Sequence, residues 1–122
     1  MTTRQDSFTQ AIARLGDALT APETDLSRDA AIQRFEFCFE LAWKVIQERV
    51  RTEGLDCQSP KGCFKLAYKN NWIGEEAGWL AMVEDRNRTA HTYDEALAKT
   101  VYRRLSGYLP LFQSLAATLR RP

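Results

Sequence analysis

The chain has 122 residues, which is the size of one ordinary domain and leaves no room for a second hydrophobic core. Its 17 basic and 16 acidic residues give a net charge of +1, so the molecule as a whole has no field that would attract nucleic acid or an anionic membrane. Any contact with RNA must therefore be local. Charges interrupt every apolar stretch, and residues 1–6 lack the apolar core of a signal peptide, which predicts a cytoplasmic protein without a membrane span.

Three cysteines, Cys38, Cys57 and Cys63, form an odd set without CxxC spacing. Cys38 falls among apolar helix positions, and we expect all three to be buried or unreactive thiols. A single histidine and these cysteine spacings do not supply four tetrahedral zinc ligands. The sequence therefore predicts no metal site and no bound cofactor.

The first half of the chain predicts two amphipathic helices. Apolar residues recur at steps of four, three and four from Phe8 to Leu19, and this helix should end before Pro22. The same period continues from about residue 27 to residue 53, where Gly54 supplies a C-terminal stop. Phe37 lies off the main apolar stripe of the second helix, which predicts packing against two neighbours.

Two further helices are predicted before residue 92. Ser59 is a favourable N-cap with proline after it, at the first helical position, and this short helix should end near residues 70–71. Another helix should begin near Glu75, bury Trp79, and run through Arg86 to His91.

A last helix is predicted after Asp94, which can act as its N-cap. Apolar residues from Leu97 to Leu119 follow steps of three and four, which is the pattern of a core-facing seam. Pro110 within this seam predicts a kink, or a break into two helices near Gly107. The complete pattern predicts a single all-α domain over residues 1–122, an antiparallel bundle of four or five helices.

Few residues are able to carry chemistry, and His91 is the only histidine. Asn87 precedes it by four residues, so on a helix an amide would share its face and hold one imidazole nitrogen. A lone histidine near a helix end is more often a surface or capping residue. Arg86 follows an apolar run and has two interpretations. It either serves a phosphate site or forms an ion pair with one of four acidic residues: Glu84, Asp85, Glu36 or Glu40.

The spacing Arg86, His91, Tyr93 resembles the R-x4-H-x-Y motif of the HEPN superfamily, in particular of its HepT-like toxins. Further stretches agree in order and approximate spacing with the related nucleotidyltransferase substrate-binding proteins: residues 34–36, 39–44, 59–61, 79–80 and 91–95. The resemblance covers about residues 5–119. It implies a helical bundle that dimerises, with the motifs of two protomers facing each other across a cleft.

The resemblance also implies a function, that of a metal-independent endoribonuclease in a toxin–antitoxin pair. Arg86 and His91 would be catalytic, with Asn87 orienting His91 or binding a phosphate oxygen. Arg86, Arg88 and Lys61 would bind RNA or nucleotide. The partner would be a minimal nucleotidyltransferase, the antitoxin, which transfers AMP to Tyr93 and so silences the nuclease.

Four alternatives remain open from the sequence, two for the function and two for single residues. The polar cleft could instead hold a nucleotide or substrate for the partner enzyme, which would make the chain a non-catalytic binding subunit. The bundle could also serve only for assembly. Tyr93 could merely pack at a helix boundary or bond to Arg86, and Lys61 belongs to a lysine stripe that is more often a solvated face.

Overall fold

The computed structural model describes residues 2–120, which fold into five α-helices and one short 3-10 helix without any strand. The elements are α1 (Arg4–Thr20), α2 (Asp25–Thr52), α3 (Pro60–Lys69), α4 (Glu76–Arg88), η1 (Thr89–His91) and α5 (Glu95–Leu119). The predicted all-α bundle is confirmed. No helix within residues 2–120 is long and apolar enough to span a bilayer.

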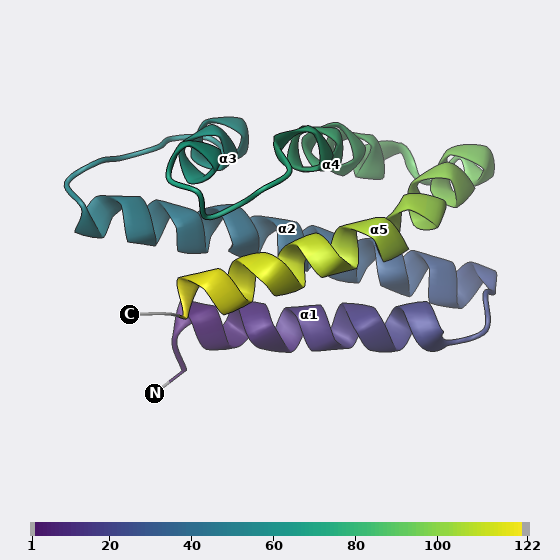
Figure 1. Ribbon diagram of the computed structural model, residues 1–122. Helices are drawn as coiled ribbons and strands as arrows, with labels where there is room; N and C mark the ends of the chain where they lie inside the picture. The colour runs from purple at the N-terminus through teal and green to yellow at the C-terminus, as the bar shows by residue number, and fades with distance from the viewer. Residues whose placement is uncertain (1, 121–122) are drawn as a thin grey trace.

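The helix α2 is the centre of the bundle (Figure 1). It runs antiparallel to α1, and α5 lies against both of them. In this view α3 and α4 are seen almost along their axes, so they cross α2 steeply on the side away from α1. Because α2 packs against α1, α3 and α5, it is apolar on more than one face, which confirms the predicted packing against more than one neighbour. Phe37, the residue on which that prediction rested, is itself 50% exposed.

Local signals in the sequence set the helix ends. Thr3 caps α1 in a reciprocal capping box with Asp6, and Thr24 caps α2 in the same way with Ser27. Beyond α2, Gly54 has a φ of +79°, the left-handed conformation that suits a glycine after a helix end. The predicted stop is confirmed.

A cluster of aromatic rings joins all five α-helices in the core, and α1 contributes Phe8, 6.1 Å from Phe112. Phe35 on α2 contacts two residues of α5, with ring centroids 5.6 Å from Tyr108 and 6.1 Å from Phe112. Phe64 on α3 and Trp79 on α4 lie 4.8 Å apart in the same core. Such rings bury large apolar areas, and this cluster therefore fixes α3, α4 and α5 against α2.

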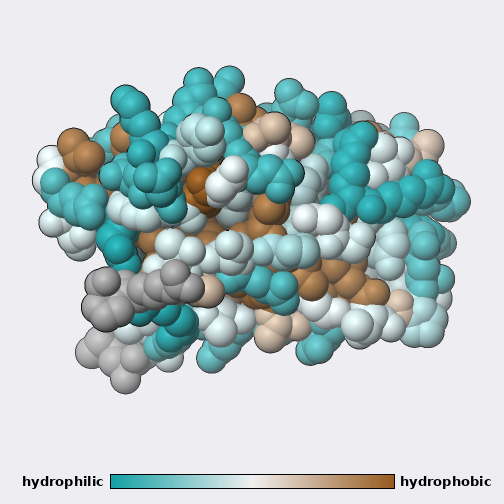
Figure 2. Space-filling model, in the orientation of Figure 1, coloured by the Kyte–Doolittle hydropathy of each residue, from teal (hydrophilic) through white to brown (hydrophobic). Residues whose placement is uncertain are grey.

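Of the two outcomes predicted for Pro110, a kink or a break, the break near Gly107 is wrong, because α5 continues through Pro110 to Leu119. Figure 1 shows the helix bending along its length instead. Pro110 removes the donor for the carbonyl of Ser106, and both residues are exposed, so water can replace the missing partner. On the face drawn in Figure 2, apolar residues of α5 are visible between hydrophilic side chains.

The prediction of three buried or unreactive thiols is wrong for Cys57 and Cys63 and confirmed for Cys38. Cys57 and Cys63 form a disulfide with a Cα–Cα distance of 5.1 Å, whereas Cys38 is a free, buried thiol. The reason for the pairing is a reversal of the chain. Ser59 caps α3 by accepting a hydrogen bond from Gly62, and this tight turn returns Cys57 to the first turn of the helix.

Burial raises the pKa of the Cys38 thiol to about 12.

Candidate functional site

The predicted motif lies where α4 ends and η1 begins. The helix α4 stops at Arg88, three residues earlier than the sequence predicted, and the tighter η1 carries the chain to His91. Asp94 then caps α5 by accepting a hydrogen bond from the backbone of Leu97 at 3.2 Å, which confirms its predicted role. This helix end presents His91 and Tyr93 in a short connection between two rigid elements.

Arg86 reaches from α4 to α2. Its guanidinium lies 3.6 Å from the carboxylates of both Glu36 and Glu40, which confirms the ion pairing expected with acids of the second helix. The alternative acids, Glu84 and Asp85, pair with Arg88 instead. The Nε of Arg86 is buried and has no hydrogen-bond partner among the described residues, although the side chain as a whole is 30% exposed. The Arg86 side chain is thus partly accessible to solvent.

Thr89 connects Arg86 to η1. Its buried hydroxyl donates to the Arg86 carbonyl at 2.6 Å and accepts from the Arg86 guanidinium at 3.1 Å. Its own carbonyl accepts a hydrogen bond from Thr92 at 3.1 Å. The arginine, the last turn of α4 and the start of η1 are therefore held as one unit.

His91, Tyr93 and Asn87 are exposed around this unit. The rings of His91 and Tyr93 meet edge to face with centroids 6.1 Å apart, and Tyr93 is 86% exposed, more than any other large apolar or aromatic side chain described. Within residues 2–120 no hydrogen bond joins Asn87 to His91, and none joins Tyr93 to Arg86. The tyrosine hydroxyl is thus exposed and has no hydrogen-bond partner among the described residues.

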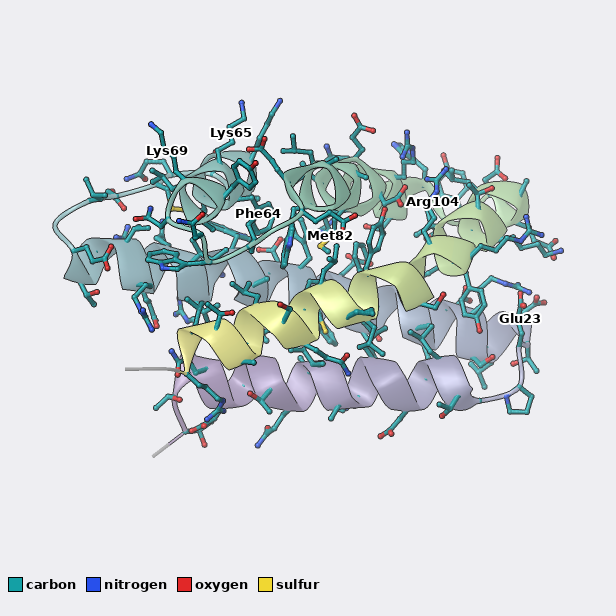
Figure 3. All side chains as sticks on the ribbon, viewed as in Figure 1. Glu23, Phe64, Lys65, Lys69, Met82 and Arg104 are labelled. Carbon is teal, nitrogen blue, oxygen red and sulfur yellow. A yellow bond between two sulfur atoms is a disulfide. The ribbon has the colours of Figure 1, made fainter. Side chains whose placement is uncertain are left out.

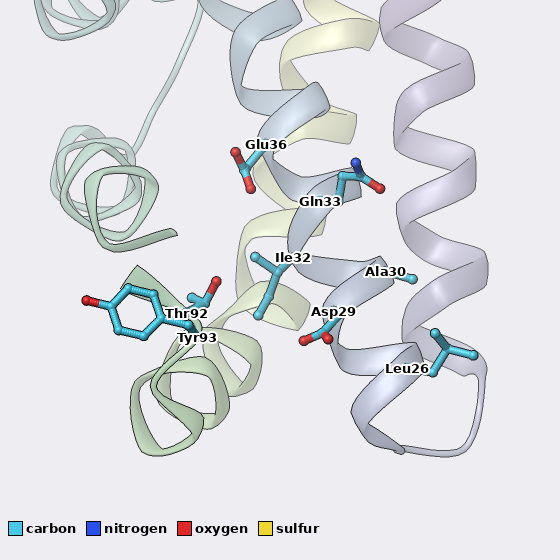
Figure 4. A pocket seen from close by; sticks show the side chains of 8 residues that line it. All are labelled: Leu26, Asp29, Ala30, Ile32, Gln33, Glu36, Thr92 and Tyr93. Atoms are coloured by element: carbon cyan, nitrogen blue, oxygen red, sulfur yellow. The ribbon is translucent and has the colours of Figure 1, made fainter. Parts of the chain in front are cut away.

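A groove of about 550 Å³ lies between α2 and this connection (Figure 4). Its walls comprise six residues of α2 and two of the η1–α5 connection: Leu26, Asp29, Ala30, Ile32, Gln33, Glu36, Thr92 and Tyr93. Because Glu36 also pairs with Arg86, the groove and the arginine are contiguous. The lining has two carboxylates, Asp29 and Glu36, and no cation, so the groove itself does not favour a phosphate.

A buried carboxylate behind the motif was not foreseen from the sequence. Asp85 is fully buried, and its Oδ1 accepts hydrogen bonds from Arg88 at 2.8 Å and Arg104 at 2.7 Å. Its Oδ2 accepts one from the Tyr108 hydroxyl at 2.5 Å. Burial, together with the adjacent carboxylate, raises the pKa of Tyr108 well above its ordinary value, so this hydroxyl stays protonated and donates.

One signal in the sequence would have found this carboxylate. Met82, Asp85 and Thr89 follow each other at steps of three and four, and the first and last of them are buried. An acid on such a stripe points into the core and must meet a cation or donor there. The consequence for the motif is that Arg88, predicted to bind nucleotide or RNA, is already held by Asp85.

The lysines of α3 are separate from this site. Lys61, Lys65 and Lys69 are all exposed, and Figure 3 shows Lys65 and Lys69 projecting outward from the bundle, whereas Phe64 points into it. Across residues 2–120 no three side chains of histidine, cysteine, aspartate or glutamate are grouped so that they could hold a metal ion.

Comparison with known proteins assigns the family. Residues 3–121 match the family described as nucleotidyltransferase substrate binding protein like. A probable ribonuclease HepT of Haemophilus influenzae is 32% identical over 96 residues. The matched segment makes up 75% of this chain and 66% of that protein, so the chain spans slightly less than two thirds of this curated relative.

Solved structures agree on the fold. A crystal structure of a protein from Thermus thermophilus is 41% identical, with a TM-score of 0.88, and the alignment covers 93% of this chain and 99% of that one. A tri-AMPylated HEPN toxin of Shewanella oneidensis, in complex with its MNT antitoxin, shares the fold at 19% identity, with a TM-score of 0.79 over 98% of this chain and 95% of that one. The family match over residues 3–121 shows that the chain belongs to the nucleotidyltransferase substrate binding protein-like family.

Proposed function

We propose that this chain is a HepT-like toxin, an endoribonuclease that uses Arg86 and His91 and is neutralised when a minimal nucleotidyltransferase attaches AMP to Tyr93. The observation that carries the proposal is the placement of the motif. His91 and Tyr93 are exposed next to each other, on a connection that buried contacts of Arg86 and Thr89 hold in place. A site that acts on RNA and is also modified needs both properties, an accessible surface and a fixed geometry.

The proposed reaction uses only groups that the motif supplies and involves no metal ion. The RNA 2'-oxygen forms a bond to the adjacent phosphorus while the bond from phosphorus to the 5'-oxygen breaks. One imidazole takes the proton of the 2'-hydroxyl and another gives a proton to the leaving 5'-oxygen. Arg86 neutralises the charge that develops on the phosphate oxygens. Asn87, exposed one turn before His91, would contact a phosphate oxygen or orient the ring.

This reaction requires two protomers, because each chain has one histidine. In a two-fold dimer the same residue acts as base from one protomer and as acid from its partner. Arg86 is ion-paired to α2 at distances of 3.6 Å, longer than a hydrogen bond, so a phosphate can compete for its donors. Lys61 would add a weaker contact to the RNA backbone, whereas the Arg88 guanidinium is already engaged.

Tyr93 is the proposed acceptor in the neutralising step. Its hydroxyl oxygen forms a bond to the α-phosphorus of ATP, pyrophosphate leaves, and the hydroxyl proton passes to solvent. The added nucleotide brings negative charge and bulk beside His91, whose ring already contacts Tyr93. RNA phosphate would then be repelled from the site. The AMPylated HEPN toxin of Shewanella oneidensis, which has the same fold, supports this step.

The deciding experiment is induction of the chain alone in bacteria, beside the His91→Ala variant at equal expression. We expect growth arrest and RNA cleavage with the native chain and neither with the variant. His91 is exposed, so the alanine variant should fold normally, and circular dichroism provides the control. If both chains are harmless, the nuclease proposal fails.

The family description favours a second candidate, a binding subunit that presents a nucleotide or substrate to its nucleotidyltransferase. In that case the groove beside Tyr93 would hold the ligand. Isothermal titration of the purified chain with ATP, and then with AMP, separates the two candidates. Tight binding together with harmless expression would favour the subunit, whereas RNA cleavage that depends on His91 would exclude it as the sole function.

A further inference from the structure

Asp85 ties the end of α4 to α5 immediately before the motif begins. Its carboxylate is fully buried, and both oxygens are engaged, by Arg88 and Arg104 on one side and by the Tyr108 hydroxyl on the other. A buried carboxylate is strongly destabilising unless charges and hydrogen bonds compensate it, and here both are provided. Because Arg104 and Tyr108 both belong to α5, the compensation exists only while α4 and α5 keep their relative positions.

The next residue, Arg86, fixes the same helix end in a different direction. Successive residues of an α-helix point about 100° apart, since 3.6 residues complete a turn. Asp85 therefore reaches α5 while Arg86 reaches Glu36 and Glu40 on α2. Two adjacent side chains hold the last turn of α4 between two helices, and η1, which carries His91, continues from this turn.

We propose that Asp85 is the positioning residue of this site: through Arg104 and Tyr108 it fixes where α4 ends, and so places His91 relative to Arg86. It does not touch substrate, because no part of it reaches solvent. Arg88, whose side chain is 42% exposed, then serves as one of the donors to Asp85. The catalytic consequence of this assignment rests on the proposed ribonuclease function, but the structural consequence does not.

The structural consequence is testable because His91 is the only histidine, so the carbon-bound protons of its ring give unambiguous NMR signals. We would compare Asp85→Asn with Leu15→Ala, a substitution in the buried part of α1. Urea denaturation gives the free energy of unfolding of each variant, and the two are compared under conditions in which these free energies are equal. The His91 signals should shift or broaden in Asp85→Asn and stay native in Leu15→Ala. Native signals in both variants, or equal changes in both, would overturn the proposal.

Two milder variants keep the test decisive if Asp85→Asn does not fold. Tyr108→Phe removes one of the three donors, and Arg104→Lys keeps the charge without the guanidinium fork. Each should move the His91 signals in the same direction as Asp85→Asn, but less far. If both leave these signals unchanged, Asp85 only contributes stability.

Kinetics then test the link to function. Misplacement of a catalytic group by about 1 Å costs on the order of a hundredfold in rate, so Asp85→Asn should lower kcat at least about tenfold and change KM little. Leu15→Ala, at matched stability, should retain kcat. Loss of kcat in both variants would overturn the positioning role. If the native chain cleaves no RNA, the proposed function fails while the NMR comparison still decides the role of Asp85.

Discussion

At the scale of single residues, the hydroxyl of Thr89 has two functions that a methyl group cannot replace. It donates to the carbonyl of Arg86 and accepts from its guanidinium. We expect Thr89→Val to lower the free energy of unfolding by about 1 kcal/mol, the usual net value of a buried hydrogen bond. Thr89→Ser, which keeps the hydroxyl, should remain within about half of that value of the native stability. Urea denaturation measures both, and equal losses in the two variants would contradict this role.

Cys38 predicts a specific dependence of stability on alkaline pH. Burial raises the pKa of its thiol from an ordinary value of 9.0 to about 12, so the folded state favours the protonated form. The contribution of the Cys38 thiol to the free energy of unfolding is fully present below pH 9. It is lost as the pH rises toward 12, because the thiol ionises at lower pH in the unfolded chain than in the folded one. The urea midpoint should therefore fall more steeply between about pH 9 and 11 in the native chain than in Cys38→Ala. Tyr108 contributes in the same direction in both proteins, so only the difference between the two curves reports on Cys38.

The spacing of the sequence predicted the exposed residues of the site, His91 and Tyr93. It did not predict the contacts of the buried Asp85 behind them. The spacing of Arg86, His91 and Tyr93 identifies the motif, and the ion pairing of Arg86 with α2 was one of two interpretations that the residue types allowed. Asp85 was considered only as a partner for Arg86. Which cation a buried acid meets depends on how α5 lies against α4, and that arrangement is a property of the tertiary structure.

At the scale of elements, helix ends followed from capping residues and helix faces from periodicity. Ser59 and Asp94 cap α3 and α5 where the sequence placed them. Spacing was less informative at Pro110, where the loss of a backbone hydrogen bond opposes the packing of the rest of the helix. There α5 bends without breaking. Contacts of Phe112 and Leu115 beyond the proline bury enough apolar surface to outweigh one missing hydrogen bond.

The disulfide between Cys57 and Cys63 should stabilise the start of α3. It closes a short loop, with a sequence separation of six, and loop-closure entropy gives such a crosslink about 2 kcal/mol. We expect Cys57→Ser, and separately reduction by dithiothreitol, to lower the free energy of unfolding by about this amount. Reduction of the Cys57→Ser variant is the control and should change nothing further. An unchanged urea midpoint in the native chain after reduction would show that the crosslink does not contribute.

At the scale of the whole molecule, the proposed nuclease predicts that activity depends on association. One histidine per chain cannot act as base and acid in the same step, so only the dimer should cleave RNA. Specific activity should therefore fall on dilution in parallel with the dimer fraction, measured by light scattering at the same concentrations. A monomeric preparation with full activity would defeat the two-protomer mechanism.

The two ends of the described chain meet at one extremity of the bundle. Gln5 donates to the carbonyl of Leu119 at 3.2 Å, Arg120 contacts Asp6 at 3.3 Å, and Arg49, in the last turn of α2, donates to the same Leu119 carbonyl at 2.7 Å. The groove beside Tyr93 is lined by residues near the opposite end of α2. Twenty residues of α2, from position 29 to position 49, correspond to roughly 30 Å at 1.5 Å per residue. A surface tether attached at this extremity of the bundle would consequently stand clear of Tyr93, so the chain can be immobilised for single-molecule measurements without covering the groove.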